Sequence, residues 1–138
     1  MSDLDQFVEW FRTTWTQAEH ALHSGDAGPR TAIWSEHDPV TLFGAWLSAS
    51  GAAEVRAVFP RLAAGFAAVT SSRIDLIAVE VSGDLAYTAH REITSVSVDG
   101  IPRQYVLRVT QVYRREDGQW RVVHRHGDEE SEPPASGS

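Results

Sequence analysis

Residues 99–126 read DGIPRQYVLRVTQVYRREDGQWRVVHRH, and this segment decides the fold class. Asp99-Gly100 and Asp117-Gly118 are dipeptides that tight β-hairpins favour, because both central residues of such a turn take positive φ. The residues between them, 103–115, alternate in polarity and are rich in valine and tyrosine, as strands are. Residues 120–126 continue this pattern after the second turn. The segment therefore predicts antiparallel strands joined by two hairpins.

The strand pattern extends toward the N-terminus. Residues 85–98 form one candidate strand and residues 73–81 another, with a turn at Ser82-Gly83-Asp84 between them. We therefore expect a meander of antiparallel strands, within one domain that spans residues 1–127. Residues 128–138, DEESEPPASGS, are acidic and rich in Pro, Ser and Gly, so we expect a disordered tail there.

Helical patterns occupy the first half of the chain. A first helix is capped by Ser2 and followed by a stop at Ser24-Gly25, and a short second helix spans residues 29–34. A short strand is expected over residues 40–46, and a third helix over residues 51–69. The apolar stripe of the first helix recurs at spacings of three and four residues: Leu4, Phe7, Val8, Phe11, Trp15, Ala18 and Leu22.

Helices that come first and strands that come last indicate an α+β fold. Long hairpin strands twist, so we expect a strongly curved, mainly antiparallel sheet packed against the helices. Wrapped around the first helix and closed at one end by the third, such a sheet forms a cone with a cavity. The fold class that we predict is therefore α+β and cone-shaped.

The composition excludes several kinds of chemistry. The 138 residues include no cysteine, so disulfides, thiolate nucleophiles and cysteine metal sites are excluded, and no lysine, so no Schiff base can form. The formal net charge of −7 argues against a nucleic-acid partner. No apolar run is long enough for a membrane span, no glycine-rich phosphate loop implies a cofactor, and no signal-peptide pattern is present. We therefore expect a cytoplasmic protein without a cofactor.

Two groups of residues carry a resemblance to known families. The pattern of Gly25-Asp26, Trp34 and residues 40–44 (VTLFG) resembles SnoaL-like proteins, which share a cone-shaped fold with nuclear transport factor 2. Residues 99–126 are similar to the last two strands of the association domain of calcium/calmodulin-dependent protein kinase II, where a Gly-Ile-Pro-Arg turn precedes a strand and the chain ends in His-x-His. The resemblance implies a hollow, dimeric cone, and this superfold hosts enzymes, binding proteins and assembly modules.

Neither family's site transfers intact to this chain. The resemblance to ketosteroid isomerase, another member of the superfamily, implies a carboxylate base on the first strand, but that position falls near Phe43. The association domain has an arginine-rich pocket, and the corresponding positions here hold Glu92, Gln111 and Gly127. Gln111 is still a candidate ligand-binding residue on this basis.

His124 and His126 lie two residues apart on the last strand, so simple alternation places both on the face of Trp120 and Val122. Alternation places Arg125 on the other face. If the histidines face the cavity, they form a candidate catalytic pair that transfers protons near neutral pH. The alternative is a structural role at the end of the sheet or at a dimer contact. Two histidines alone do not make a metal site, and we predict none.

A second polar cluster lies on the strand formed by residues 85–98. His90 and Glu92 share one face of that strand with Thr88 and Thr94. They form a candidate acid–base pair if this row faces the cavity, or a solvated or dimer-facing row if it faces outward. Arg108, inside an apolar stretch, is a candidate ligand-binding residue, or the partner of Glu92 in a structural ion pair.

Aromatic residues from the helices and the first strand are candidates for an apolar cavity wall, with core packing as the alternative: Trp15, Trp34, Trp46 and Phe59. Tyr87 and Tyr105 are further hydroxyl donors. His20 and His23 are expected on the exposed side of the first helix.

The sequence thus favours a protein that binds a small, largely apolar molecule, with isomerase-, cyclase- or dehydratase-type proton transfer. The alternative is a non-catalytic module that forms homodimers through its sheet face.

Overall fold

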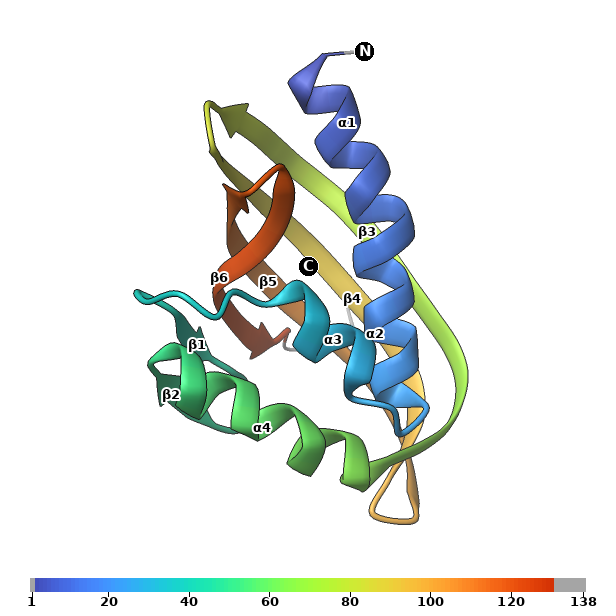
Figure 1. Cartoon of the computed structure of the whole chain (residues 1–138). Helices are drawn as coiled ribbons and strands as arrows, with labels where there is room; N and C mark the ends of the chain where they lie inside the picture. Colours follow the sequence, from blue (N-terminus) through green and yellow to red (C-terminus); the bar gives the residue numbers. More distant parts are fainter. Residues whose placement is uncertain (1, 131–138) are drawn as a thin grey trace.

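The structure is a computed structural model that describes residues 2–130 (Figure 1). It confirms the α+β class: helices precede a long meander, and a short β-hairpin separates the helices. The helical elements are α1 (Asp3–Trp10), a π-helical turn η1 (Phe11–Trp15), α2 (Thr16–His23), α3 (Gly28–Ile33) and α4 (Ala52–Gly65). The strands are β1 (Thr41–Phe43), β2 (Ser48–Ser50), β3 (Phe66–Ser82), β4 (Leu85–Val98), β5 (Ile101–Glu116) and β6 (Gln119–Glu129).

The first helix runs without a break through α1, η1 and α2. Ser2 caps it with a capping box, in which its hydroxyl accepts a hydrogen bond from the Asp5 amide. Gly25 ends it with a φ of +96°, a conformation that glycine adopts without steric cost. Both ends therefore lie where the local sequence places them.

The sheet has the order β2-β1-β6-β5-β4-β3. β1 runs parallel to β6, and every other neighbouring pair is antiparallel. The strand expected over residues 40–46 is shorter, because β1 ends at Phe43 and the chain turns back to pair as β2. The third helix ends at Gly65, so Phe66 belongs to β3, where it pairs with Val98 instead of extending the helical stripe. Pro60 lies inside α4, which continues past it.

The predicted start of the tail is wrong by a few residues. β6 continues to Glu129, and side-chain ion pairs join Asp128 to Arg108 and Glu130 to Arg91. Pairing with β5 keeps this acidic segment in the sheet despite its tail-like composition. The rest of the expected tail, residues 131–138, lies outside the described residues.

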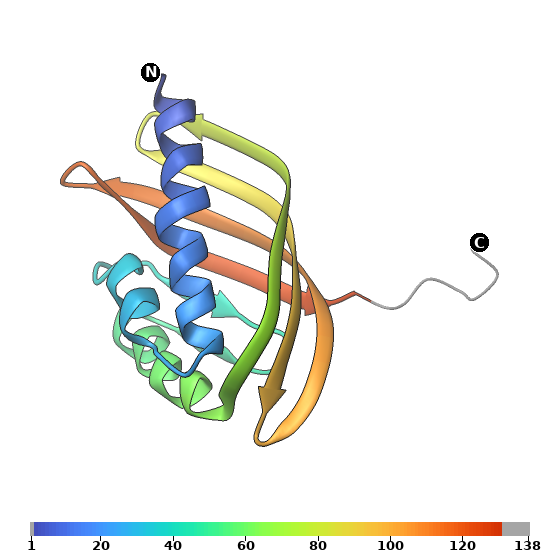
Figure 2. The same cartoon turned by 90° about the vertical axis from the view of Figure 1, so that its right-hand side faces the viewer.

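The sheet curves around the first helix, which lies against its concave face (Figure 2). Phe7, Phe11 and Trp15 are buried between this helix and the inner residues of β4 and β5. α4 lies across one end of the curved sheet (Figure 1). The arrangement is the predicted cone, with its interior between the helices and the sheet. No helix between residues 2 and 130 is long and apolar enough to cross a membrane.

Candidate functional site

A β-bulge in β6 decides which side chains face the interior. Tyr113 of β5 pairs with Val122, but the preceding residue, Val112, pairs with His124, so Val123 is an extra residue in the ladder. The insertion exchanges the two faces of the strand beyond this point. Trp120 and Val122 point inward, whereas Arg125 is the inward residue in the second half of β6.

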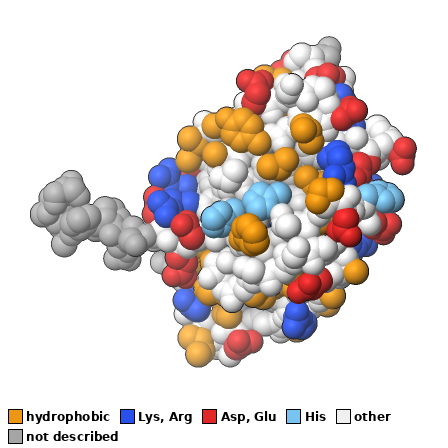
Figure 3. Space-filling view, turned by 90° about the vertical axis from the view of Figure 1, so that its left-hand side faces the viewer, with side chains coloured by type: hydrophobic (Ala, Val, Ile, Leu, Met, Phe, Trp, Pro, Cys, Tyr) orange, Lys and Arg blue, Asp and Glu red, His pale blue; other side chains and the backbone are white. Residues whose placement is uncertain are grey.

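Of the two alternatives for His124 and His126, the cavity-facing pair is therefore wrong, because both lie on the outer face of the sheet. His124 Nδ1 is 2.7 Å from the Thr41 hydroxyl, and the Phe43 ring contacts both imidazoles edge-on, with centroids 5.6 and 5.8 Å away. Figure 3 shows histidine side chains beside hydrophobic ones at the surface. Partial burial, together with the neighbouring His126, lowers the pKa of His124.

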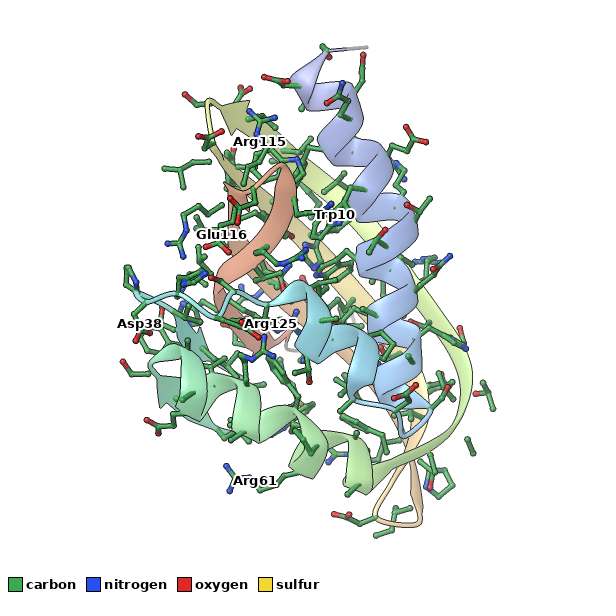
Figure 4. The ribbon with its side chains drawn as sticks, in the orientation of Figure 1. Trp10, Asp38, Arg61, Arg115, Glu116 and Arg125 are labelled. Carbon is green, nitrogen blue, oxygen red and sulfur yellow. The ribbon has the colours of Figure 1, made fainter. Side chains whose placement is uncertain are left out.

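The polar row of β4 faces inward. His90 and Glu92 are each 2% exposed. Arg125 of β6 binds both carboxylate oxygens of Glu92 at 2.7 Å, across the intervening strand β5. Figure 4 shows Arg125 inside the molecule, whereas Arg61 points away from α4. The expected pairing of Glu92 with Arg108 is wrong, because Arg108 points outward and pairs with Asp128 at the surface.

Glu92 and Arg125 belong to a closed ring of hydrogen bonds. Arg125 donates to Gln111 Oε1 at 3.0 Å, which orients the Gln111 amide so that it donates to the Tyr113 hydroxyl at 2.5 Å. From Tyr113 the ring continues to the Thr88 hydroxyl, which is 2.7 Å from the Tyr113 hydroxyl and 3.2 Å from His90 Nδ1. It closes at Glu92, whose Oε2 lies 2.9 Å from His90 Nε2.

Arginine only donates and a carboxylate only accepts, so His90 Nε2–H donates to Glu92. With a neutral His90, whose Nδ1 then only accepts, Thr88 donates to Nδ1 and the Tyr113 hydroxyl donates to Thr88. Burial opposes the ionisation of Glu92, but the charge and hydrogen bonds of Arg125, with the hydrogen bond from His90, hold its pKa well below 4.5. Glu92 is consequently a weak base, and the ring satisfies its own members.

A pocket opens beside this ring, at the end of the cone near α4. Its floor is polar and its walls are mostly apolar. Its cavity volume is about 40 Å³, which is room for only a few water-sized groups. The lining residues are Glu19, Leu22, His23, Arg30, Leu42, Gly44, Ala45, Trp46, Leu47, Leu62, Phe66, Glu92, Tyr105, Leu107 and Arg125.

A buried ion pair between α2 and α3 forms one part of the pocket floor. Arg30 Nη2 contacts Glu19 Oε1, and the side chains are 5% and 3% exposed. The other oxygen of Glu19, Oε2, and Arg30 Nε have no hydrogen-bond partner among residues 2–130. The pair is thus only half satisfied by the protein itself.

His23 and Tyr105 form a second polar pair in the pocket wall. His23 Nδ1 lies 2.8 Å from the Glu19 carbonyl, which can only accept, so Nδ1 carries a proton. His23 Nε2 lies 2.8 Å from the Tyr105 hydroxyl. Burial lowers the pKa of His23, against an opposing effect of Glu19, and burial raises the pKa of Tyr105. At neutral pH Nε2 therefore accepts a hydrogen bond from Tyr105 and is a base.

The predicted ligand-binding residues fall into separate places. Trp46 lies in the pocket wall and is 49% exposed. Trp15, Trp34 and Phe59 are buried in the core, where Trp15 contacts the His90 ring and Trp34 contacts Phe59. Of the other candidates, Gln111 is in the hydrogen-bonded ring and Arg108 is at the surface.

Sequence reasoning missed Glu19, His23 and Arg30, and it placed His23 on the exposed side of the helix, which is wrong. A signal for two of them was present. Glu19 and His23 follow Trp15 at steps of four, beside Ala18 and Leu22, so they lie within the apolar stripe. A charged residue and a histidine on the buried face of an amphipathic helix indicate a functional or paired site. In residues 2–130 no cluster of three or more metal-ligating side chains occurs.

Comparisons with known proteins agree with this architecture. The family model described as SnoaL-like domain matches residues 8–127. A proposed dehydratase of the nuclear transport factor 2-like family from Streptomyces avermitilis is 21% identical, with a TM-score of 0.74 over 93% of this chain and 99% of that one. A proposed calcium/calmodulin-dependent protein kinase type II association domain from Thiobacillus denitrificans is also 21% identical, with a TM-score of 0.72 over 89% and 94%.

A nuclear transport factor 2-like protein from Salmonella enterica is 12% identical, with a TM-score of 0.73 over 98% of this chain and 96% of that one. No match was found among curated proteins. At these identities the solved structures establish the fold and not the activity. The family model covers most of the chain, including most of the first helix, all the residues that line the pocket and nearly all of the long strands. The chain therefore belongs to the SnoaL-like domain family.

Proposed function

We propose that this protein binds a small, largely apolar molecule in the pocket and exchanges a proton with it through His23 and Tyr105. The observation that carries the proposal is the placement of a neutral imidazole, with its basic Nε2 held by a tyrosine hydroxyl, in a pocket whose walls are apolar. Leu22, Leu62 and Trp46 are positioned to contact the apolar body of the ligand. Isomerisation, cyclisation and dehydration each need such a proton acceptor.

The proton transfer uses the hydrogen bond already in place. A ligand X–H group gives its proton to the Tyr105 oxygen while the Tyr105 hydroxyl proton moves to His23 Nε2. The ligand becomes an anion, Tyr105 stays neutral, and His23 becomes an imidazolium. The Glu19 carbonyl stabilises that cation, because it accepts the Nδ1–H hydrogen bond, and the negative charges of Glu19 and Glu92 act in the same direction. This route assigns to His23 the role first expected of His90 and Glu92.

The binding part of the proposal is tested by titrating the protein with toluene and recording amide and indole NMR signals. Signals of Ala45 and Trp46 should shift, since both residues line the pocket. Signals of the surface hairpin at Asp117 and Gly118 should not. Shifts spread over the whole surface, or none in the pocket, would contradict ligand binding there.

The catalytic part is tested with 5-nitrobenzisoxazole, whose ring opens when a base removes one carbon-bound proton. We expect His23→Gln to lower the rate of ring opening by about a hundredfold, within the range that a positioned base contributes. His20→Gln is the matched control, because His20 lies three residues earlier on the same helix and is exposed. Equal rates in the two variants would rule out His23 as the base.

A second candidate function is assembly through the outer face of the sheet. Phe43 and Tyr87 are 45% and 42% exposed on this face. Arg91 and Arg108 form ion pairs there with Glu130 and Asp128. A surface with both signs of charge around apolar residues can pair with a copy of itself across a two-fold axis. Sedimentation at increasing concentration tests this: a dimer that Tyr87→Glu dissociates supports it, and a monomer at all concentrations contradicts it.

A further inference from the structure

The proton-transferring pair of the proposed function lies beside a cavity that is too small for an apolar ring. His23 and Tyr105 are only 5% and 7% exposed, and the cavity volume beside them is about 40 Å³. A single benzene ring occupies a cavity of about 150 Å³ in a protein interior. Part of the pocket wall therefore has to move before a molecule of that size reaches these two side chains.

The segment between β1 and β2 is the part of the wall that is held least firmly. Residues 44–47, the β1–β2 loop, belong to no helix or strand, and all four line the pocket. One backbone hydrogen bond, from Gly44 N–H to the Leu47 carbonyl at 2.8 Å, closes their turn. β1 and β2 have three residues each and lie at the edge of the sheet (Figure 1). Apart from Leu42, the other lining residues lie on helices or on the four long strands, where successive backbone hydrogen bonds fix them.

Trp46 is the side chain of this loop that contacts Tyr105. The two rings meet edge to face, with centroids 5.3 Å apart and planes at 85°. Trp46 is 49% exposed, whereas Leu22 and Phe66 in the same wall are 1% and 8% exposed. Because the loss of hydrophobic stabilisation scales with the apolar area returned to water, Trp46 can swing outward at a smaller cost than either of them. Its outward movement uncovers the Tyr105 ring, whose hydroxyl is hydrogen-bonded to His23.

The closed turn of the loop depends on a glycine. A Cβ atom at position 44 would lie 2.9 Å from the Leu47 carbonyl oxygen, which is closer than carbon and oxygen atoms normally approach without a bond. The same oxygen accepts the Gly44 N–H hydrogen bond, so a side chain at position 44 and the closed turn compete for one space. A single methyl group at this position therefore shifts the loop away from its closed form.

We propose that the β1–β2 loop is a lid on the pocket and that Trp46 must swing outward before a ligand reaches Tyr105 and His23. The proposal rests on the proposed function, since it takes this pocket as the ligand site. After the ligand has entered, Trp46 packs against it and keeps bulk water away from the proton transfer, as closing loops do in many enzymes.

The lid is tested without a ligand by the reaction of diethyl pyrocarbonate with unprotonated imidazoles. Fragment mass spectrometry follows His23, with the exposed His20 as the reference for the reagent. A buried group reacts in proportion to the population of the open form, so Trp46→Ala should raise the rate at His23 relative to His20 by about tenfold or more. Gly44→Ala should also raise it, because it loosens the turn. Leu85→Ala is the control, since Leu85 is 53% exposed on β4 and does not line the pocket, and it should leave the ratio unchanged.

A second measurement uses toluene, whose association rate constant follows from the exchange broadening of amide NMR signals in the pocket. Ala45 and Leu62 supply these signals, since both line the pocket. Toluene enters only the open form, so Trp46→Ala should raise the association rate constant by a factor similar to that found for His23. Leu85→Ala should leave it unchanged.

The outcomes separate the lid from the proposed function. Wild-type His23 that reacts as fast as His20, or equal rates at His23 in the wild-type protein and in the folded Trp46→Ala and Gly44→Ala variants, would overturn the lid. Binding of toluene in the pocket in that case would leave the proposed function standing. Reactivity of His23 that depends on Trp46, without any binding of toluene, would contradict the proposed function and keep Trp46 as the gate to His23. Thermal denaturation checks that each variant is folded, and either folded variant decides the question.

Discussion

Two buried networks in this molecule use the same residue types with different results. In the ring around Arg125, the guanidinium binds both oxygens of Glu92, and a chain of hydrogen bonds returns through Gln111 and His90 to the same carboxylate. In the pocket floor, Arg30 and Glu19 also pair, but Glu19 Oε2 and Arg30 Nε have no hydrogen-bond partner within residues 2–130. The comparison teaches that the same pair of residue types can satisfy its hydrogen bonds fully, when neighbouring polar side chains complete the network, or only in part, when they are lacking.

The largest expected effect comes from breaking the closed ring. Arg125→Met should lower the free energy of unfolding by about 3–5 kcal/mol, because it leaves the buried carboxylate of Glu92 without its counter-ion. Urea denaturation measures this loss. Arg108→Met is the matched control, since Arg108 pairs with Asp128 at the exposed surface, where ion pairs contribute little. If both variants lose the same stability, the ring has no special structural role.

A smaller effect is expected from removing one hydroxyl of the ring. Thr88→Val keeps the shape of the side chain but leaves the Tyr113 hydroxyl without its acceptor and His90 Nδ1 without its donor. The cost should be about 1–3 kcal/mol, the usual penalty for an unpaired buried group. Thr94→Val, at an equally buried position in the same row but outside the ring, serves as the control. The prediction requires that Thr88→Val cost clearly more in urea denaturation.

The smallest effect distinguishes the two networks by pH. Burial lowers the folded-state pKa of His23 below 6.5, although Glu19 and Glu92 oppose this shift and Arg30 adds to it. Between that folded pKa and about 6.5, the unfolded chain binds more protons, so stability falls as the pH drops, by at most about 1.4 kcal/mol per pH unit. His23→Gln should remove the share of this slope that His23 contributes, whereas the share of His124, whose pKa is also lowered, remains.

The ring should respond only in stronger acid. The folded pKa of Glu92 lies well below 4.5, so its contribution is complete above that value and is lost as the pH falls through the folded pKa. Stability curves of the wild-type protein and of His23→Gln that run parallel from neutral pH to pH 4.5 would contradict the assignment of a buried, neutral His23.

Local sequence patterns predicted most of the elements. The dipeptides Asp99-Gly100 and Asp117-Gly118 marked two hairpins correctly, because the positive φ values at these positions are local requirements. The cap at Ser2 and the stop at Gly25 were equally local. The polar row of His90 and Glu92 was also found, but its direction was left open, since alternation defines two faces without saying which one is buried.

The faces of β6 and the pocket floor could not be predicted in the same way. The extra residue at Val123 exchanges the faces of the strand. Because Val122 and Val123 are both apolar, the sequence is compatible with a regular strand and with a bulged one. Glu19 and His23 were overlooked although their spacing places them on the buried stripe. A charged or titratable residue is expected to be exposed unless a buried partner is known. Here the partners are Arg30 for Glu19 and Tyr105 for His23, and both come from other elements.

The sequence by itself determined the α+β class, the order of the helices and strands, the turns and the chemistry that is excluded for want of cysteine and lysine. Only the tertiary structure decided that Arg125 and not Arg108 pairs with Glu92, that the two C-terminal histidines lie outside, and that His23 lies at the pocket. The physical reason is the range of the interactions. Turns and helix ends depend on neighbours in the chain, whereas burial, ion pairing and an atom left without a partner depend on residues brought together from distant elements.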